Sequence, residues 1–124
     1  MKNDKEKFKK EFKARIYSFI LKLVKNIDSL PKDTSSQIFA KQILRSSTSI
    51  GANYIEAQAA SSKKDFANFF HYALKSANET KFWLAILKDT GKMNKTEAEA
   101  LIKELLEIAN ILAASLITIK GKNK

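Results

Sequence analysis

The sequence predicts an all-α protein built as an antiparallel, up-and-down four-helix bundle. Its 124 residues include three Gly and one Pro, too few for a β-sandwich or barrel, which needs a turn signal roughly every 8–12 residues. Apolar residues recur at helical spacing in four long stretches, and short polar segments with capping signals separate these stretches. Because a chain of this length usually forms one domain, we expect a single domain over residues 1–124.

The first helix is expected over residues 5–27. Steps of three and four separate most of its apolar residues, which is the spacing of one helix face. These residues are Phe8, Phe12, Ile16, Phe19, Ile20, Leu23 and Ile27. Pro31 disfavours a helical conformation at Leu30, so we expect the helix to end before these two residues.

Capping signals mark the starts of the second and third helices, which are expected over residues 35–59 and 63–88. Thr34-Ser35-Ser36-Gln37 and Ser62-Lys63-Lys64-Asp65 have the form of a capping box, in which a hydroxyl group and a side chain three residues later bond the free amides of the first turn. Gly91 is expected to end the third helix in a left-handed conformation.

The fourth helix is expected over residues 95–119, opened by Asn94-Lys95-Thr96-Glu97 and followed by a basic tail at residues 120–124. Each of the four helices would have about 24 residues and a length of roughly 36 Å. Long helices joined by short loops are typical of an antiparallel bundle.

Several classes of site are excluded or weakened by the composition. The chain has no Cys and a single His, His71, so disulfides, thiolate nucleophiles and His-based zinc sites are excluded. His71 has aromatic neighbours and no second ligand at helical spacing, which favours a packing role. We therefore expect no enzyme activity, no catalytic residue, no metal and no cofactor. The charged N-terminus and the breaks at Ser18 and Lys22 predict neither a signal peptide nor a membrane span, hence a cytoplasmic protein.

The positive charge gathers near the N-terminus. The chain carries 23 Lys and Arg against 13 Asp and Glu, and residues 1–30 hold nine of the former against four of the latter. Such an array favours phosphate binding through counterion release. Because nearly all of these cations are Lys, which contacts phosphate as a point charge, we expect low sequence specificity. The predicted phosphate contacts are Lys7, Lys10, Arg15, Lys22, Lys25, Lys63 and Lys64. The alternative is a solvated surface whose charge is incidental.

A polar row on the second helix predicts a structural hydrogen-bond network. Arg45, Ser49, Asn53 and Glu56 follow one another at steps of four, four and three, and Ser76 and Glu79 of the third helix are their expected partners. Such a network would fix how the two helices pack, because a buried charge must be paired. A solvated face and an acid/base site are the alternatives, the latter weakened by the lack of any spacing typical of a catalytic set.

Apolar residues exceed what one bundle buries. Phe82 to Leu87 are apolar in every direction around the third helix, and Leu106 and Ile117 lie beside the main stripe of the fourth. A helix that is hydrophobic all round must be covered on both sides. We therefore predict self-association through Phe82, Trp83, Ile86, Leu106 and Ile117. The alternative is a wide core with Trp83 partly exposed at one end.

These residues also carry a family resemblance. The stretch from Gln42 to Ala57, with Ser62 to Phe66 and Ser76 to Glu79, resembles the four-helix bundle proteins known as 23S rRNA intervening-sequence proteins. The matching positions are Arg45, Ser49, Ile50, Asn53, Glu56, Asp65, Phe66, Ser76 and Glu79. Ala57 and Lys75 stand where that family usually has glycine. The resemblance covers almost the whole chain.

A second likeness lies within the same fold class. Phe82-Trp83-Leu84 and the Ala-, Ile- and Leu-rich last helix are similar to the accessory variability determinant of diversity-generating retroelements. The resemblance implies a four-helix bundle, a homopentameric ring with a basic surface, and nucleic acid and a reverse transcriptase as partners. We therefore expect a non-enzymatic, homo-oligomeric accessory protein that binds RNA or DNA with low sequence specificity. The alternative is a protein-interaction scaffold whose positive charge is incidental.

Overall fold

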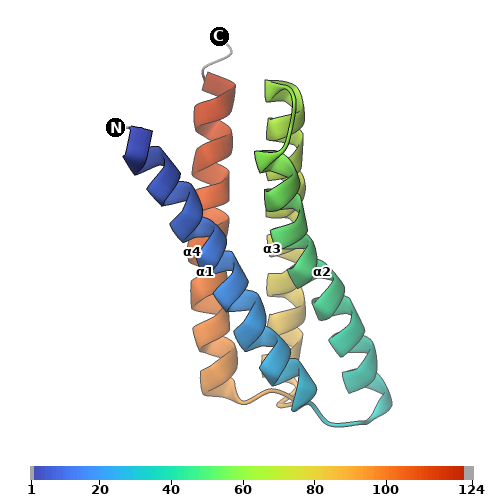
Figure 1. Ribbon diagram of the computed structural model, residues 1–124. Coiled ribbons are helices and arrows are strands. Elements are labelled where there is room, and N and C mark those ends of the chain that lie inside the picture. Colours follow the sequence, from blue (N-terminus) through green and yellow to red (C-terminus); the bar gives the residue numbers. More distant parts are fainter. Residues whose placement is uncertain (1, 122–124) are drawn as a thin grey trace.

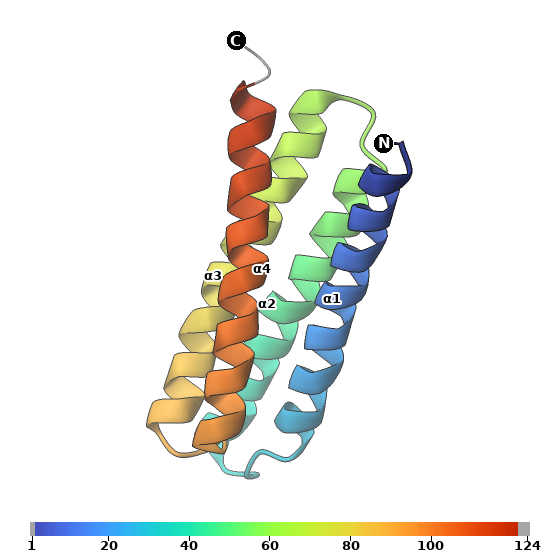
Figure 2. The same cartoon turned by 90° about the vertical axis from the view of Figure 1, so that its left-hand side faces the viewer.

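The computed structural model describes residues 2–121, which form four α-helices. The helices are α1 (Lys2–Asp28), α2 (Thr34–Gln58), α3 (Lys63–Asp89) and α4 (Lys95–Gly121). Each helix runs antiparallel to the one before it, and the start of α1 and the end of α4 lie at the end of the bundle that holds the α2–α3 loop (Figures 1 and 2). The expected all-α four-helix bundle is confirmed. Gly121 still belongs to α4, and the remainder of the expected basic tail lies outside the described residues.

The caps explain where three of the helices begin. Ser62 accepts a hydrogen bond from the Asp65 amide at 3.1 Å, as expected for the start of α3. Asn94 accepts one from the Glu97 amide at 3.0 Å. The cap of α2 differs from the expected capping box that starts at Thr34. Asp33 is the N-cap, and its carboxylate accepts a hydrogen bond from the Ser36 hydroxyl at 2.6 Å. A charged acceptor one residue earlier competes better for the amides of the first turn than the Thr34 hydroxyl does.

Gly91 ends α3 in the left-handed region, as expected. Its φ is +73°, a conformation that costs glycine little because it has no Cβ. The Lys92 and Met93 amides then both donate to the carbonyl of Leu87 at 3.1 Å. These bonds satisfy a carbonyl that the last turn would otherwise leave free.

The core lies along the inner faces of all four helices. Its largest fully buried apolar side chains are Phe19, Leu23, Ile43, Ile50, Leu84, Leu87, Leu105, Ile108 and Leu112. At Gly51, a Cβ would lie 3.2 Å from Cδ1 of Ile20, so the absent side chain lets α1 approach α2 there. Figure 1 shows α1 running obliquely across the bundle. In the described part of the chain, no helix is apolar over a length sufficient to cross a membrane.

Candidate nucleic-acid interface

Lysines line a groove between the N-terminal half of α1 and the C-terminal end of α2. The groove has a volume of about 560 Å³. Its lining residues are Asn3, Glu6, Lys7, Lys9, Lys10, Lys13, Tyr54 and Gln58. We call Lys7, Lys9, Lys10 and Lys13 the groove lysines. They place four cationic side chains around one concave surface.

The groove lysines are largely free of internal partners. Lys7 lies 3.9 Å from the Glu11 carboxylate on the same exposed helix face, a pair that contributes little in water. Within residues 2–121, Lys9, Lys10 and Lys13 form no ion pair. Their positive charge is therefore available to an external anion.

Two of the groove lysines were absent from the predicted contacts. Lys7 and Lys10 are among the predicted phosphate contacts, and Lys9 and Lys13 lie in the same groove. The available signal was spacing, because residues 6, 9, 10 and 13 follow the three-and-four pattern of one helix stripe. That stripe faces the end of α2 through Tyr54, whose hydroxyl donates to the Lys9 carbonyl at 3.4 Å. Burial raises the pKa of the Tyr54 hydroxyl, so it stays protonated as this donor.

Lys63 and Lys64 lie in the first turn of α3, at the same end of the bundle as the groove lysines (Figures 1 and 2). Both side chains are exposed. Two elements far apart in the sequence therefore contribute lysines to one end of the molecule.

Arg15 was predicted as a phosphate contact, but the structure places it in an internal ion pair. Its Nε and Nη2 donate to the two carboxylate oxygens of Glu104 at 2.7 and 2.8 Å, and Nη2 lies 3.0 Å from Glu107. These hydrogen bonds raise the pKa of Arg15 and lower the pKa of Glu104. Arg15 thus joins α1 to α4 and is removed from the set of free cations.

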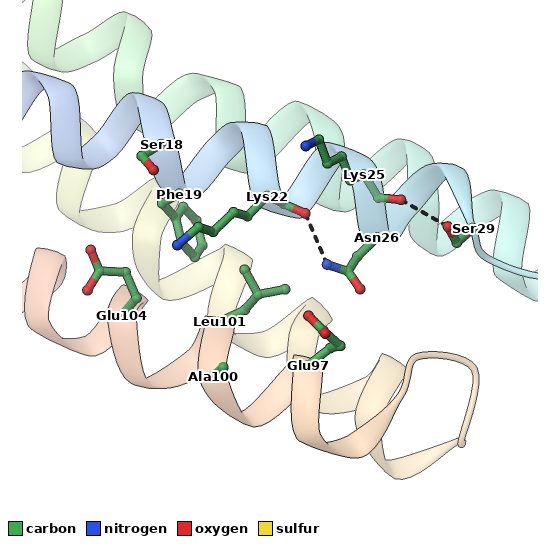
Figure 3. Close-up of a pocket in the computed structure, with 10 residues that line it drawn as sticks. All are labelled: Ser18, Phe19, Lys22, Lys25, Asn26, Ser29, Glu97, Ala100, Leu101 and Glu104. Carbon is green, nitrogen blue, oxygen red and sulfur yellow. Dashed lines mark hydrogen bonds between the residues drawn. The ribbon is translucent and has the colours of Figure 1, made fainter.

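Lys22 and Lys25 line a different groove, between α1 and α4, with a volume of about 770 Å³ (Figure 3). Glu97 and Glu104 line the same groove, and the nearby charge of Lys22 helps to lower the pKa of Glu104. In Figure 3, Lys22 extends towards Phe19 while Lys25 points away from α4. Because charges of both signs meet here, this groove attracts a polyanion less than the groove lysines do.

The predicted polar network joins α2 to α3 through most of its expected members. Arg45 pairs with Glu79, and the Trp83 indole donates to Glu79 at 3.0 Å. The bond from Trp83, together with Arg45, lowers the pKa of Glu79. All three side chains are at least partly exposed, so this end of the network is solvated.

Hydroxyl groups continue the network towards the core. Ser76 donates to the Ser49 hydroxyl at 3.0 Å, and the Asn53 amide donates to the same oxygen at 3.0 Å. The most buried pair, Ser46 and Thr80, was not among the predicted members; their hydroxyl oxygens lie 2.9 Å apart. Thr80 lies four residues after Ser76, a helical spacing that would have included it.

Glu56 lies outside this network. Its side chain is exposed and makes no hydrogen bond or ion pair within the described residues. His71 is exposed as well, and no cluster in residues 2–121 has the His, Cys, Asp or Glu groups to hold a metal ion.

The predicted interface residues divide into two groups. Phe82, Leu106 and Ile117 are exposed, with Ile117 at 73%. Trp83 and Ile86 are partly buried, and the Trp83 ring lies 6.0 Å from that of Phe39. Part of the apolar surplus is thus covered within the chain, and part faces solvent.

Comparison with known proteins places the chain in a family. The family described as 23S rRNA-intervening sequence protein matches residues 9–114. A solved structure from Bacteroides thetaiotaomicron, described as a protein of unknown function from the S23 ribosomal protein family, is 35% identical, with a TM-score of 0.81. The match covers 87% of this chain and 96% of that one. No curated protein matches the sequence. The chain belongs to the 23S rRNA-intervening sequence protein family.

Proposed function

We propose that this protein is a non-enzymatic, homo-oligomeric accessory protein that binds RNA or DNA through the groove lysines. The observation that carries the proposal is the set of four lysines around one groove, three of which form no ion pair within residues 2–121. Lysines that neutralise phosphates release condensed counterions, which is the main source of affinity that does not depend on sequence. Lys63 and Lys64 extend the cationic surface at the same end of the bundle.

The chemistry of the groove favours low sequence specificity. It presents ammonium groups, which lack the planar fork that arginine uses to read a guanine edge. Of the two arginines in the chain, Arg15 is held by Glu104 and Arg45 by Glu79. The contacts therefore position a backbone without reading its bases.

Fluorescence anisotropy with labelled RNA and DNA tests the proposal. The double variant Lys9→Gln/Lys13→Gln is expected to weaken binding to two nucleic acids of unrelated sequence by the same factor, because the phosphate backbone is the same whatever the base sequence. The matched control is Lys41→Gln/Lys95→Gln, which removes the same charge from exposed sites near the opposite end of the bundle. No binding at 50 mM salt, or equal losses in both double variants, would overturn the proposal.

The second candidate function is a protein-interaction scaffold. The exposed apolar side chains of Phe82, Leu106 and Ile117 favour it, because burying each against a partner contributes roughly 1.5–3 kcal/mol. A scaffold function predicts assembly without nucleic-acid binding, so the anisotropy titration distinguishes it from the proposed nucleic-acid-binding function.

A further inference from the structure

Another cavity adjoins the groove lysines at the end of the bundle that holds the α2–α3 loop. It has a volume of about 560 Å³ and receives side chains from all four helices. Lys9, Tyr54 and Gln58 line both this cavity and the groove. The two hollows are therefore neighbours.

Aromatic rings form a continuous series along this cavity. Phe8 stacks on Phe12 at 6.1 Å, Phe12 meets Tyr54 at 5.1 Å, Tyr54 meets Phe70 at 5.7 Å, and Phe70 meets Phe66 at 4.7 Å, measured between ring centroids. All five residues line the cavity. Phe8, at 52% exposure, is the ring most open to solvent. We call this lining the aromatic cavity.

We propose that the aromatic cavity receives unpaired nucleobases while the groove lysines hold the adjacent phosphates. This proposal rests on the proposed function and specifies its ligand: single-stranded or looped nucleic acid in preference to a duplex. Proteins that bind single strands combine a cationic groove with aromatic side chains on which bases stack, because every base has a π-face. In a duplex the bases are stacked on each other and cannot enter a protein cavity without being flipped out.

The charge beside the cavity identifies this occupant over a purely apolar one. Lys5 and Lys9 line the cavity next to its aromatic wall, together with one carboxylate, that of Asp4. The lining therefore keeps an excess of positive charge, so a ligand with both a flat ring and a nearby anion satisfies both features. Gln58 adds an amide that makes no hydrogen bond within residues 2–121. Such an amide can pair with the polar edge of a stacked base.

The test compares single-stranded and duplex RNA of the same length, each labelled for anisotropy. A second single strand carries 2-aminopurine, whose fluorescence is quenched when the base stacks. The wild-type chain is expected to bind the single strand more tightly and to quench the 2-aminopurine. Phe8→Ala should weaken single-strand binding roughly tenfold, the order expected for the loss of one stacked base, and should leave duplex binding unchanged.

Two further variants make the result specific. Phe8→Leu keeps an apolar side chain and removes the ring, so it should also lose the quenching. Tyr17→Ala removes an exposed ring from the same helix, 65% exposed and outside the cavity, and should change neither signal. Equal affinity for the two RNA forms, or quenching that persists in both Phe8 variants, would overturn the aromatic cavity proposal while leaving phosphate binding intact. Failure of both RNA forms to bind would overturn the proposed function itself.

Discussion

Replacing Arg15 with Met tests whether this side chain holds the bundle together. The wild-type guanidinium makes two hydrogen bonds to Glu104 and lies 3.0 Å from Glu107, so it joins α1 to α4. Methionine keeps most of the apolar stem and removes every one of these contacts. It also leaves two carboxylates near each other on α4, which repel without the guanidinium.

The expected loss follows from the exposure of the pair. A hydrogen bond to a charged group contributes about 1.5–3 kcal/mol when well shielded, but the side chains of Arg15 and Glu104 are 35% and 32% exposed. Solvent screening moves the value towards that of surface pairs. We therefore expect a coupling energy of about 1 kcal/mol between the two residues, and a melting temperature about 4 °C lower for Arg15→Met.

A double-mutant cycle with Glu104→Gln measures this coupling by urea unfolding, followed by circular dichroism at one protein concentration. Because the folded chain lowers the pKa of Glu104, its contribution is complete above the ordinary glutamate pKa near 4.3 and is lost as the pH falls through the lower, folded value. The difference in unfolding free energy between wild type and Arg15→Met should therefore shrink as the pH falls. Lys13→Met, an exposed site on the same helix, should change stability by less than about 0.5 kcal/mol. A coupling energy indistinguishable from zero would refute the role assigned to Arg15.

Three further predictions concern other parts of the molecule. Asp33→Asn should lower the melting temperature at pH 7, because bonds from Lys92 and the α2 cap lower the pKa of Asp33. The difference in melting temperature should fade below about pH 3.9, and equal melting temperatures of variant and wild type at pH 7 would contradict this prediction. Thr80→Val should lower the free energy of unfolding by about 1 kcal/mol, because it removes the buried bond to the Ser46 hydroxyl. It should cost less in a chain that already carries Ser46→Ala, and equal costs in the two backgrounds would show that the hydroxyls act independently. Light scattering should give about five times the 14.0 kDa chain mass, and Phe82→Glu or Ile117→Glu should reduce this mass, whereas a mass of 14.0 kDa for the wild-type chain would refute assembly.

The helices were predictable because local signals decide them. The four expected ranges lie close to α1–α4, since helical periodicity and the caps at Ser62 and Asn94 act over a few residues. The cap of α2 was misassigned because Thr34 and Asp33 are both competent acceptors. The charge of the Asp33 carboxylate favours it as the cap, and Lys92, far along the chain, lies 2.8 Å from that carboxylate.

The candidate site was predictable only in part, for a related reason. The sequence shows which residues are cationic but not which residues they pair with. Arg15 pairs with Glu104, which lies 89 residues later in the chain. The groove that joins Lys9 and Lys13 to Gln58 likewise depends on how α1 crosses α2. The ion pair between Arg45 and Glu79 could be predicted, because each residue lies in the polar row of its own helix and α2 is adjacent to α3.

The salt dependence of binding tests the central claim, that the groove lysines bind phosphates. Each phosphate contact on duplex DNA contributes about −0.9 to the slope of log affinity against log salt. Replacing Lys7, Lys9, Lys10 and Lys13 by Gln should therefore make the slope less negative by about 3.6. The same slope in the wild-type chain and the fourfold variant would contradict the account.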